Sequence, residues 1–95
     1  MMSEAKTFAI EAVNFSFSIK EIKVKKGDSV KVVFTNNGSY PHDFVIDELN
    51  IKTKQLKTGE TDEVIFVADK EGLYEYYCSV GNHRKQGMVG KLIVE

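Results

Sequence analysis

One short segment of the chain contains three side chains that bind soft metal ions. Cys78, His83 and Met88 form a Cys-x4-His-x4-Met pattern, so a thiol, an imidazole and a thioether occur within eleven residues. The other histidine, His42, lies far upstream, just before the apolar run 44–46. Two imidazoles, a thiolate and a weak thioether ligand are the set that holds copper in a trigonal site with a long axial bond. The four residues therefore predict one mononuclear copper ion.

Each of these side chains has an ordinary interpretation when it is considered alone. A single cysteine is most often a small buried apolar residue, and a methionine is most often a filler in a core. A histidine in a polar loop is commonly just an exposed residue. The copper hypothesis therefore depends on the four residues occurring together, and a structural sandwich without metal is the alternative if they do not converge.

The spacing also indicates how the chain positions these residues. A strand that ends at Cys78 presents its sulfur at the end of the strand, and the loop 79–87 turns back with the second histidine. Met88 then opens the return strand. His42 has to come from a separate segment, because one tight loop does not easily surround an ion. The predicted site therefore requires two distant parts of the chain to meet.

Strand-like alternation of apolar and polar residues recurs along the chain, whereas helical periodicity is weak. Turn signals such as the Lys-Gly-Asp sequence at 26–28 separate the segments. Residues 48–61 are polar and broken, and the strand-like segments are 8–12, 15–17, 22–24, 30–34, 44–46, 63–68, 73–77 and 88–94. Seven or eight short strands predict an all-β antiparallel sandwich or barrel, and an immunoglobulin-like sandwich fits the same pattern.

Length and composition restrict the function classes. The 95 residues are expected to form one domain, 1–95. Thirteen basic and fourteen acidic residues give a net charge of −1 without a basic block, which argues against a nucleic-acid binder. No apolar run reaches the roughly 20 residues of a membrane span, and the first residues do not resemble a signal peptide. One cysteine and two histidines exclude four-cysteine zinc sites and iron–sulfur clusters.

Longer segments around the candidate ligands resemble the cupredoxins. Residues 36–48, Asn-Asn-Gly-Ser-Tyr-Pro-His-Asp-Phe-Val-Ile-Asp-Glu, resemble the first-histidine segment of plastocyanin. Residues 74–94 resemble the cupredoxin ligand loop and closing strand, and residues 17–34 are similar to the family's early hairpin. Residues 48–61 match poorly. The resemblance implies an eight-stranded Greek-key β-sandwich that carries one type 1 copper ion and transfers electrons.

The family pattern assigns a role to each candidate ligand. It implies that His42 and His83 are the histidine ligands, that Cys78 is the thiolate and that Met88 is the axial thioether. Four residues separate the cysteine from the second histidine, where plastocyanin has two, so this loop is more similar to that of azurin and auracyanin. Asp43 stands where plastocyanins commonly have asparagine.

Other residues are expected to support the site or to contact partners. Backbone groups of Asp43 and of Arg84 or a neighbour are candidates for hydrogen bonds to the sulfur, and Asn37 is a further candidate for support. The ring edge of His83 is predicted to serve as the electron port, within an uncharged docking patch of Gly38, Ser39, Tyr40, Pro41, Gly81, Asn82, Gly87 and Val89. Arg84 and Lys85 favour an acidic partner surface or serve solubility.

The predicted function is transient electron transfer between redox partner proteins, by cycling of Cu(II) and Cu(I) in a monomer. The resemblance implies an extracytoplasmic location, in the periplasm or at the cell surface. A copper carrier or storage domain with the same ligands is the alternative. An enzyme of the multicopper oxidase or nitrite reductase kind is not expected, because its further copper centres need more than two histidines.

Overall fold

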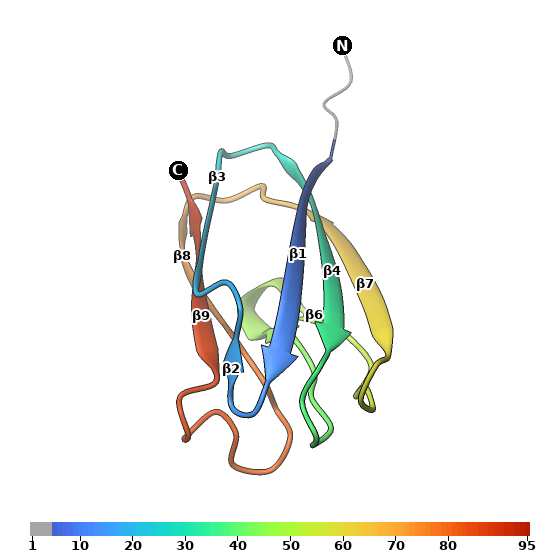
Figure 1. Ribbon diagram of the computed structural model, residues 1–95. Coiled ribbons are helices and arrows are strands. Elements are labelled where there is room, and N and C mark those ends of the chain that lie inside the picture. Colours follow the sequence, from blue (N-terminus) through green and yellow to red (C-terminus); the bar gives the residue numbers. More distant parts are fainter. Residues whose placement is uncertain (1–4) are drawn as a thin grey trace.

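The computed structural model describes residues 5–95 as a sandwich of two β-sheets (Figure 1). Its elements along the chain are β1 Lys6–Val13, β2 Ser16–Phe17, β3 Glu21–Val24, β4 Ser29–Asn36, β5 Val45–Ile46, the 3-10 helix η1 Asp47–Leu49, β6 Ile51–Lys52, β7 Thr61–Val67, β8 Gly72–Tyr77 and β9 Val89–Val94. The all-β sandwich expected from the sequence is confirmed. The described residues form nine strands rather than eight, because the two-residue β6 forms in the segment 48–61 and pairs with β5.

The two sheets are mixed rather than purely antiparallel. The four-stranded sheet has the order β2-β1-β4-β7, and the five-stranded sheet has the order β3-β9-β8-β5-β6. β1 pairs in parallel with β4, and β3 pairs in parallel with β9. These parallel pairs arise because the chain leaves the first sheet after β2, adds β3 to the second sheet and then returns with β4. Alternation of residue types does not reveal such crossings.

The central strand β4 shows how the sequence pattern produces the two layers. Its inward side chains Val30, Val32 and Phe34 are fully buried. The residues between them are half-buried on the outer face, since β4 has a neighbour on both sides. A period of two places alternate side chains on opposite faces of a strand. The apolar set of β4 therefore lies against the second sheet.

A cluster of aromatic rings fills the core between the sheets. Its members are Phe17, Phe34, Phe44 and Tyr76, with ring centroids 4.9 to 6.0 Å apart in the contacting pairs. All four side chains are at most 1% exposed. Phe44 follows His42 by two residues, and Tyr76 precedes Cys78 by two residues. The cluster therefore anchors both segments that carry candidate ligands.

The loops that carry the candidate ligands gather at one end of the sandwich. In Figure 1 the turn between β1 and β2, the segment after β4 and the loop between β8 and β9 all lie at the lower end. The start of β1 and the carboxyl end of the chain lie at the opposite end. Across residues 5–95, the only helix is too short to cross a bilayer.

The packing of Gly90 provides a test of the core. Gly90 of β9 lies opposite Tyr76 of β8, and a methyl group on Gly90 would lie 2.2 Å from the tyrosine ring. Because overpacking forces side chains out of their rotamers, Gly90→Ala is expected to lower the free energy of unfolding by about 2 kcal/mol or more. Urea unfolding of the metal-free protein measures this change. The control Lys91→Ala, at an exposed neighbour, is expected to change it by less than about 0.5 kcal/mol; equal losses would contradict the analysis.

Candidate metal centre

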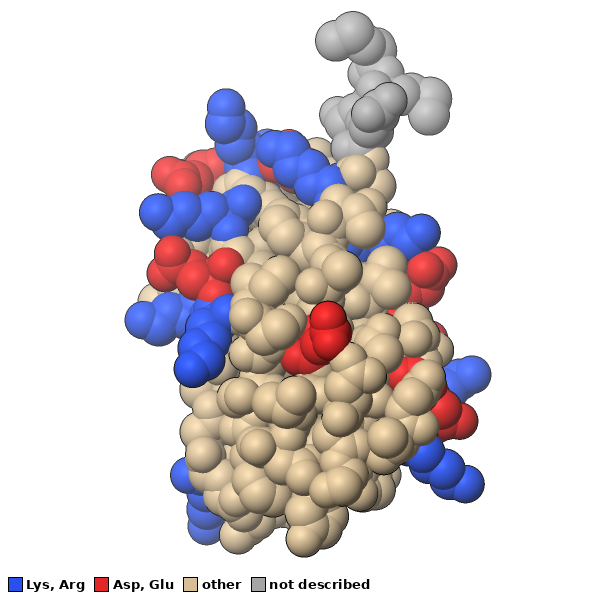
Figure 2. All heavy atoms as spheres, in the orientation of Figure 1, with Lys and Arg blue, Asp and Glu red and all other residues tan. Residues whose placement is uncertain are grey.

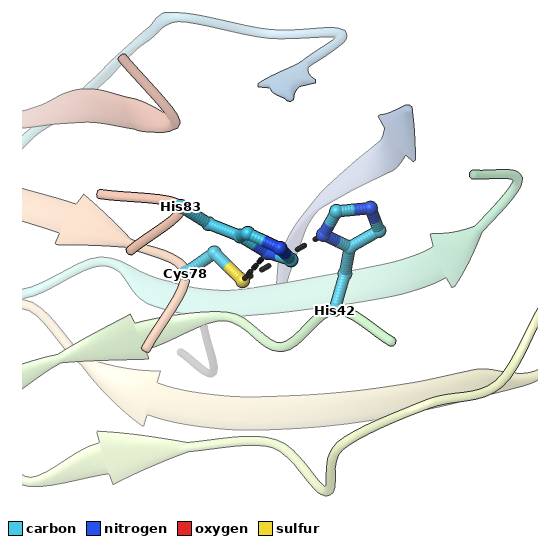
Figure 3. A group of neighbouring side chains, drawn as sticks. All are labelled: His42, Cys78 and His83. Carbon is cyan, nitrogen blue, oxygen red and sulfur yellow. Dashed lines mark hydrogen bonds between the residues drawn. The ribbon is translucent and has the colours of Figure 1, made fainter. Parts of the chain in front are cut away.

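Three of the candidate ligands converge at the loop end of the sandwich (Figure 3). The Sγ atom of Cys78 lies 3.7 Å from Nδ1 of His42 and 3.4 Å from Nδ1 of His83. All three donor atoms lie within 4.8 Å of one another, and all three side chains are buried. Bonds of about 2.3 Å to sulfur and about 2.0 Å to imidazole nitrogen, the values for zinc, are long enough to span these separations. The three donors therefore fit around one metal ion.

Met88, the fourth candidate, is fully buried and belongs to the hydrophobic core. Its backbone N–H donates to the carbonyl of His83 at 3.1 Å, and its carbonyl accepts from the N–H of Cys78 at 3.2 Å. These two hydrogen bonds close the loop and hold the backbone of Met88 beside both residues. A buried thioether at the end of this loop completes the donor set of a type 1 copper site.

The loop 79–87 folds into successive tight turns that bring the second histidine inward. The N–H of His83 donates to the carbonyl of Val80 at 3.1 Å, and further turn hydrogen bonds follow along the loop. Gly81 and Gly87 have φ angles of 50° and 98°. Glycine adopts this left-handed region at little steric cost, because it has no Cβ atom. These two glycines therefore permit the tight turns of the short loop.

His42 is fixed at its backbone and at the outer nitrogen of its ring. Leu56 accepts from its N–H at 3.1 Å and donates to its carbonyl at 2.8 Å. The Nε2 atom lies 2.9 Å from Oδ1 of Asn14. Since an amide oxygen only accepts, Nε2 carries the proton and Nδ1 keeps its lone pair toward the sulfur. Gly38 makes room for this bond, because a Cβ atom there would lie 2.5 Å from Oδ1 of Asn14.

Burial favours the metal-binding form of the histidine but opposes the metal-binding form of the cysteine. It lowers the pKa of His42, and the neighbouring His83 adds to this effect. Burial raises the pKa of the Cys78 thiol, while hydrogen bonds from the backbone N–H groups of Asp43 and Val80 lower it. A neutral imidazole is ready to bind a metal, but a thiol must first lose its proton. Metal binding is therefore coupled to release of a proton.

A buried asparagine holds the segment that leads to the first histidine. The amide group of Asn36 donates to the carbonyls of Tyr40 and Leu56, both at 2.8 Å. The adjacent Asn37, which the sequence suggested for this support, is exposed and donates to the carboxylate of Glu11. A signal for this difference was present in the sequence, since the inward alternation of β4 continues to Asn36 and excludes its neighbour.

The two other residues suggested for support lie in different surroundings. Asp43 is fully buried, and both of its carboxylate oxygens accept hydrogen bonds from Ser79. The guanidinium group of Arg84 instead pairs with Glu75 and lies 4.0 Å from the centroid of the Tyr77 ring. Its side chain therefore points along the outer face of the sheet. The backbone bonds to the sulfur come from Asp43 and from Val80.

Two aromatic side chains cover the donors on the side of the β1–β2 turn. The Phe15 ring centroid lies 4.8 Å from that of His83 and 6.3 Å from that of His42. Tyr40 stacks on Phe15 at 5.5 Å and is 53% exposed. A thin aromatic layer therefore separates the imidazoles from solvent.

Relatives of the whole sequence among known proteins include a nitrous-oxide reductase and a plastocyanin. The nitrous-oxide reductase of Stutzerimonas stutzeri is 37% identical over 84 residues, which cover 84% of this chain and 13% of that protein. The minor chloroplastic plastocyanin isoform of Arabidopsis thaliana is 37% identical over 95 residues, which cover 86% of this chain and 52% of that protein. The chain therefore spans about half the length, or less, of these relatives.

A solved structure and a family model agree with this relationship. Na-dithionite reduced auracyanin from the photosynthetic bacterium Roseiflexus castenholzii matches with a TM-score of 0.85 at 25% identity, covering 94% of this chain and 96% of that one. The family model of the Cupredoxin-like domain matches residues 2–94. Since the match extends over nearly the whole sequence, the chain belongs to the cupredoxin-like domain family.

Proposed function

We propose that the chain is a small blue copper protein that carries single electrons between redox partners. The observation that carries this proposal is the convergence of one sulfur and two Nδ1 atoms within 4.8 Å at a buried site. His42, Cys78, His83 and Met88 would hold the ion. When bound by this donor set, copper supplies a one-electron couple between Cu(II) and Cu(I).

In electron transfer, the protein's role is to hold the metal donors in fixed positions. Backbone hydrogen bonds to Leu56 hold His42, and the closed loop holds Cys78 and His83. A donor set that such contacts hold in place needs little rearrangement when the charge of the ion changes, which favours rapid electron transfer.

We infer that partners dock at the loop end, over the ring of His83. His83 is 7% exposed and His42 is fully buried, while Tyr40 beside them is exposed. Figure 2 shows charged side chains over the upper part and the margins of the visible face, and a largely uncharged lower end. A small uncharged patch suits brief redox encounters, whose interfaces are often below about 1,200 Å². Because Arg84 pairs with Glu75, attraction of an acidic partner would depend mainly on Lys85.

We also propose that the domain formed by residues 1–95 is not an enzyme by itself. Its two histidines are both used at one site, so neither is left for a second copper centre. The nitrous-oxide reductase relative is a much longer protein, and the activity in its name belongs to that whole protein. An extracytoplasmic location follows from the cupredoxin resemblance, a monomer is the default expectation for a small domain, and both stay predictions.

Cys78 provides the first test of the copper proposal. Addition of Cu(II) is expected to give an intense visible absorption band, because charge moves from the thiolate to the ion. Cys78→Ser removes the sulfur and is expected to abolish the band, whereas the control Thr7→Ser, at an exposed position of β1, is expected to keep it. Absorption and EPR spectra measure both outcomes. A colourless 1:1 copper complex of the unaltered protein would count against the proposal.

Met88 provides a test of the axial position. Met88→Leu removes the thioether but keeps an apolar side chain, so the blue band is expected to persist. The reduction potential is expected to rise by on the order of 59 mV, a tenfold change in the relative affinities for the two oxidation states. Spectroelectrochemical titration measures the potential. Leu92→Met, a reversed exchange at a buried position of β9, serves as the control, and an unchanged potential in Met88→Leu would exclude axial ligation.

The docking patch is tested by electron self-exchange, which needs no identified partner. Two copies that exchange an electron through His83 must bring their patches together, so Tyr40→Lys adds charges that repel. At low salt the rate, measured by NMR line broadening in Cu(I) and Cu(II) mixtures, is expected to fall on the order of tenfold, and less at high salt. Leu73→Lys, at a 63% exposed position of β8, is expected to keep the rate.

Two other outcomes of this experiment would argue for different conclusions. Equal slowing by Tyr40→Lys and Leu73→Lys would place the electron route elsewhere. Negligible self-exchange in the unaltered protein, together with rapid loss of Cu(I) to a modest chelator, would favour a copper carrier or storage domain instead.

A further inference from the structure

Asp43 places a carboxylate in the interior of the protein, immediately after the ligand His42. The residue is fully buried, and none of the ion pairs formed within residues 5–95 includes it. A carboxylate that is buried without a cation is costly unless hydrogen bonds compensate for the loss of water. Its presence beside a metal site therefore requires a physical explanation.

Ser79, the residue after Cys78, supplies those hydrogen bonds. Its backbone N–H donates to Oδ1 of Asp43 at 2.6 Å, and its hydroxyl group donates to Oδ2 at 2.5 Å. A backbone N–H is only a donor, so Oδ1 of Asp43 accepts from Ser79. Both oxygens of the carboxylate therefore have a hydrogen-bond partner inside the protein.

The carboxylate is connected to both segments that carry metal donors. Asp43 follows His42 directly in the chain, and its two hydrogen bonds go to Ser79, the residue after Cys78. A fixed negative charge at this place favours positive charge at the metal site.

We propose that the carboxylate of Asp43 biases the metal centre toward the more highly charged ion, Cu(II) over Cu(I), and toward divalent over monovalent ions in general. This inference rests on the proposed copper function. The Coulomb energy between a fixed charge and an ion grows in proportion to the charge of the ion, and burial limits screening by water. Asp43 acts on the ion through space, because its two oxygens are bound to Ser79.

Asp43→Asn tests this inference, because asparagine has nearly the same size and keeps an oxygen that accepts from the N–H of Ser79. The affinities for Co(II) and for Cu(I) are measured separately, by competition with chelators of known affinity. The ratio of the Co(II) affinity to the Cu(I) affinity is expected to fall on the order of tenfold. For copper itself, the reduction potential is expected to rise by about 59 mV, which is a tenfold change for a one-electron couple.

Two control variants separate the charge from the hydrogen bonds. Ser79→Ala removes the hydroxyl donor but keeps the carboxylate. Any loss of metal affinity is therefore expected to be similar for Co(II) and Cu(I). Asp69→Asn neutralises an exposed carboxylate between β7 and β8, at the end opposite the ligand loops, where solvent and salt screen its charge. Both controls are expected to change the affinity ratio by less than about threefold.

Folding and copper colour are recorded for every variant. If circular dichroism shows that metal-free Asp43→Asn does not fold, Asp43→Ser replaces it and the same affinity ratio decides. Absence of the blue band in the unaltered protein would contradict the proposed function, while the Co(II) to Cu(I) ratio would still test the carboxylate. An unchanged ratio in the variant at position 43, or an equal change in either control, would overturn the inference.

Discussion

The metal centre depends on a clamp between two segments that lie 36 residues apart, one carrying His42 and the other carrying Cys78. The clamp consists of the rings of Phe44 and Tyr76 at 4.9 Å, the strand pairing of Val45 with Tyr77, and the hydrogen bonds between Asp43 and Ser79. All three contacts join β5 and its flanking residues to β8 and its flanking residues, which are neighbours in the five-stranded sheet. Folding of the sheet therefore brings the segments that carry the donors together.

The clamp has a chemical consequence, because it buries donors that respond differently to loss of water. An imidazole that is buried stays neutral and keeps a lone pair for the metal, whereas a buried thiol resists ionisation. The backbone N–H groups that point at the sulfur of Cys78 oppose this resistance. One of them belongs to Asp43, so a residue of the clamp also lowers the pKa of the Cys78 thiol. The structural contacts and the chemistry of the site therefore share the same residues.

The sequence was sufficient to predict the donors and the all-β class, because ligand types, their spacing and strand alternation are local properties. It was not sufficient to predict which strands pair, since the parallel pairing of β1 with β4 depends on where the chain crosses between sheets. The contact between Asn14 and His42 joins residues 28 positions apart and leaves no local pattern. The inward alternation of β4 identifies Asn36, rather than Asn37, as the buried residue. This prediction requires knowing that the strand extends to Asn36.

The two imidazoles are covered in different ways, one by a hydrogen-bonded asparagine and the other by aromatic rings. The outer nitrogen of His42 is bonded to Asn14, and Gly38 lies against both of them so closely that no side chain fits there. His83 comes from the loop instead and is covered by the rings of Phe15 and Tyr40. A partner that displaces solvent from Tyr40 would approach His83 without breaking a buried hydrogen bond. The first histidine is therefore held by a hydrogen bond inside the protein, whereas the second lies beneath two aromatic rings, one of them exposed.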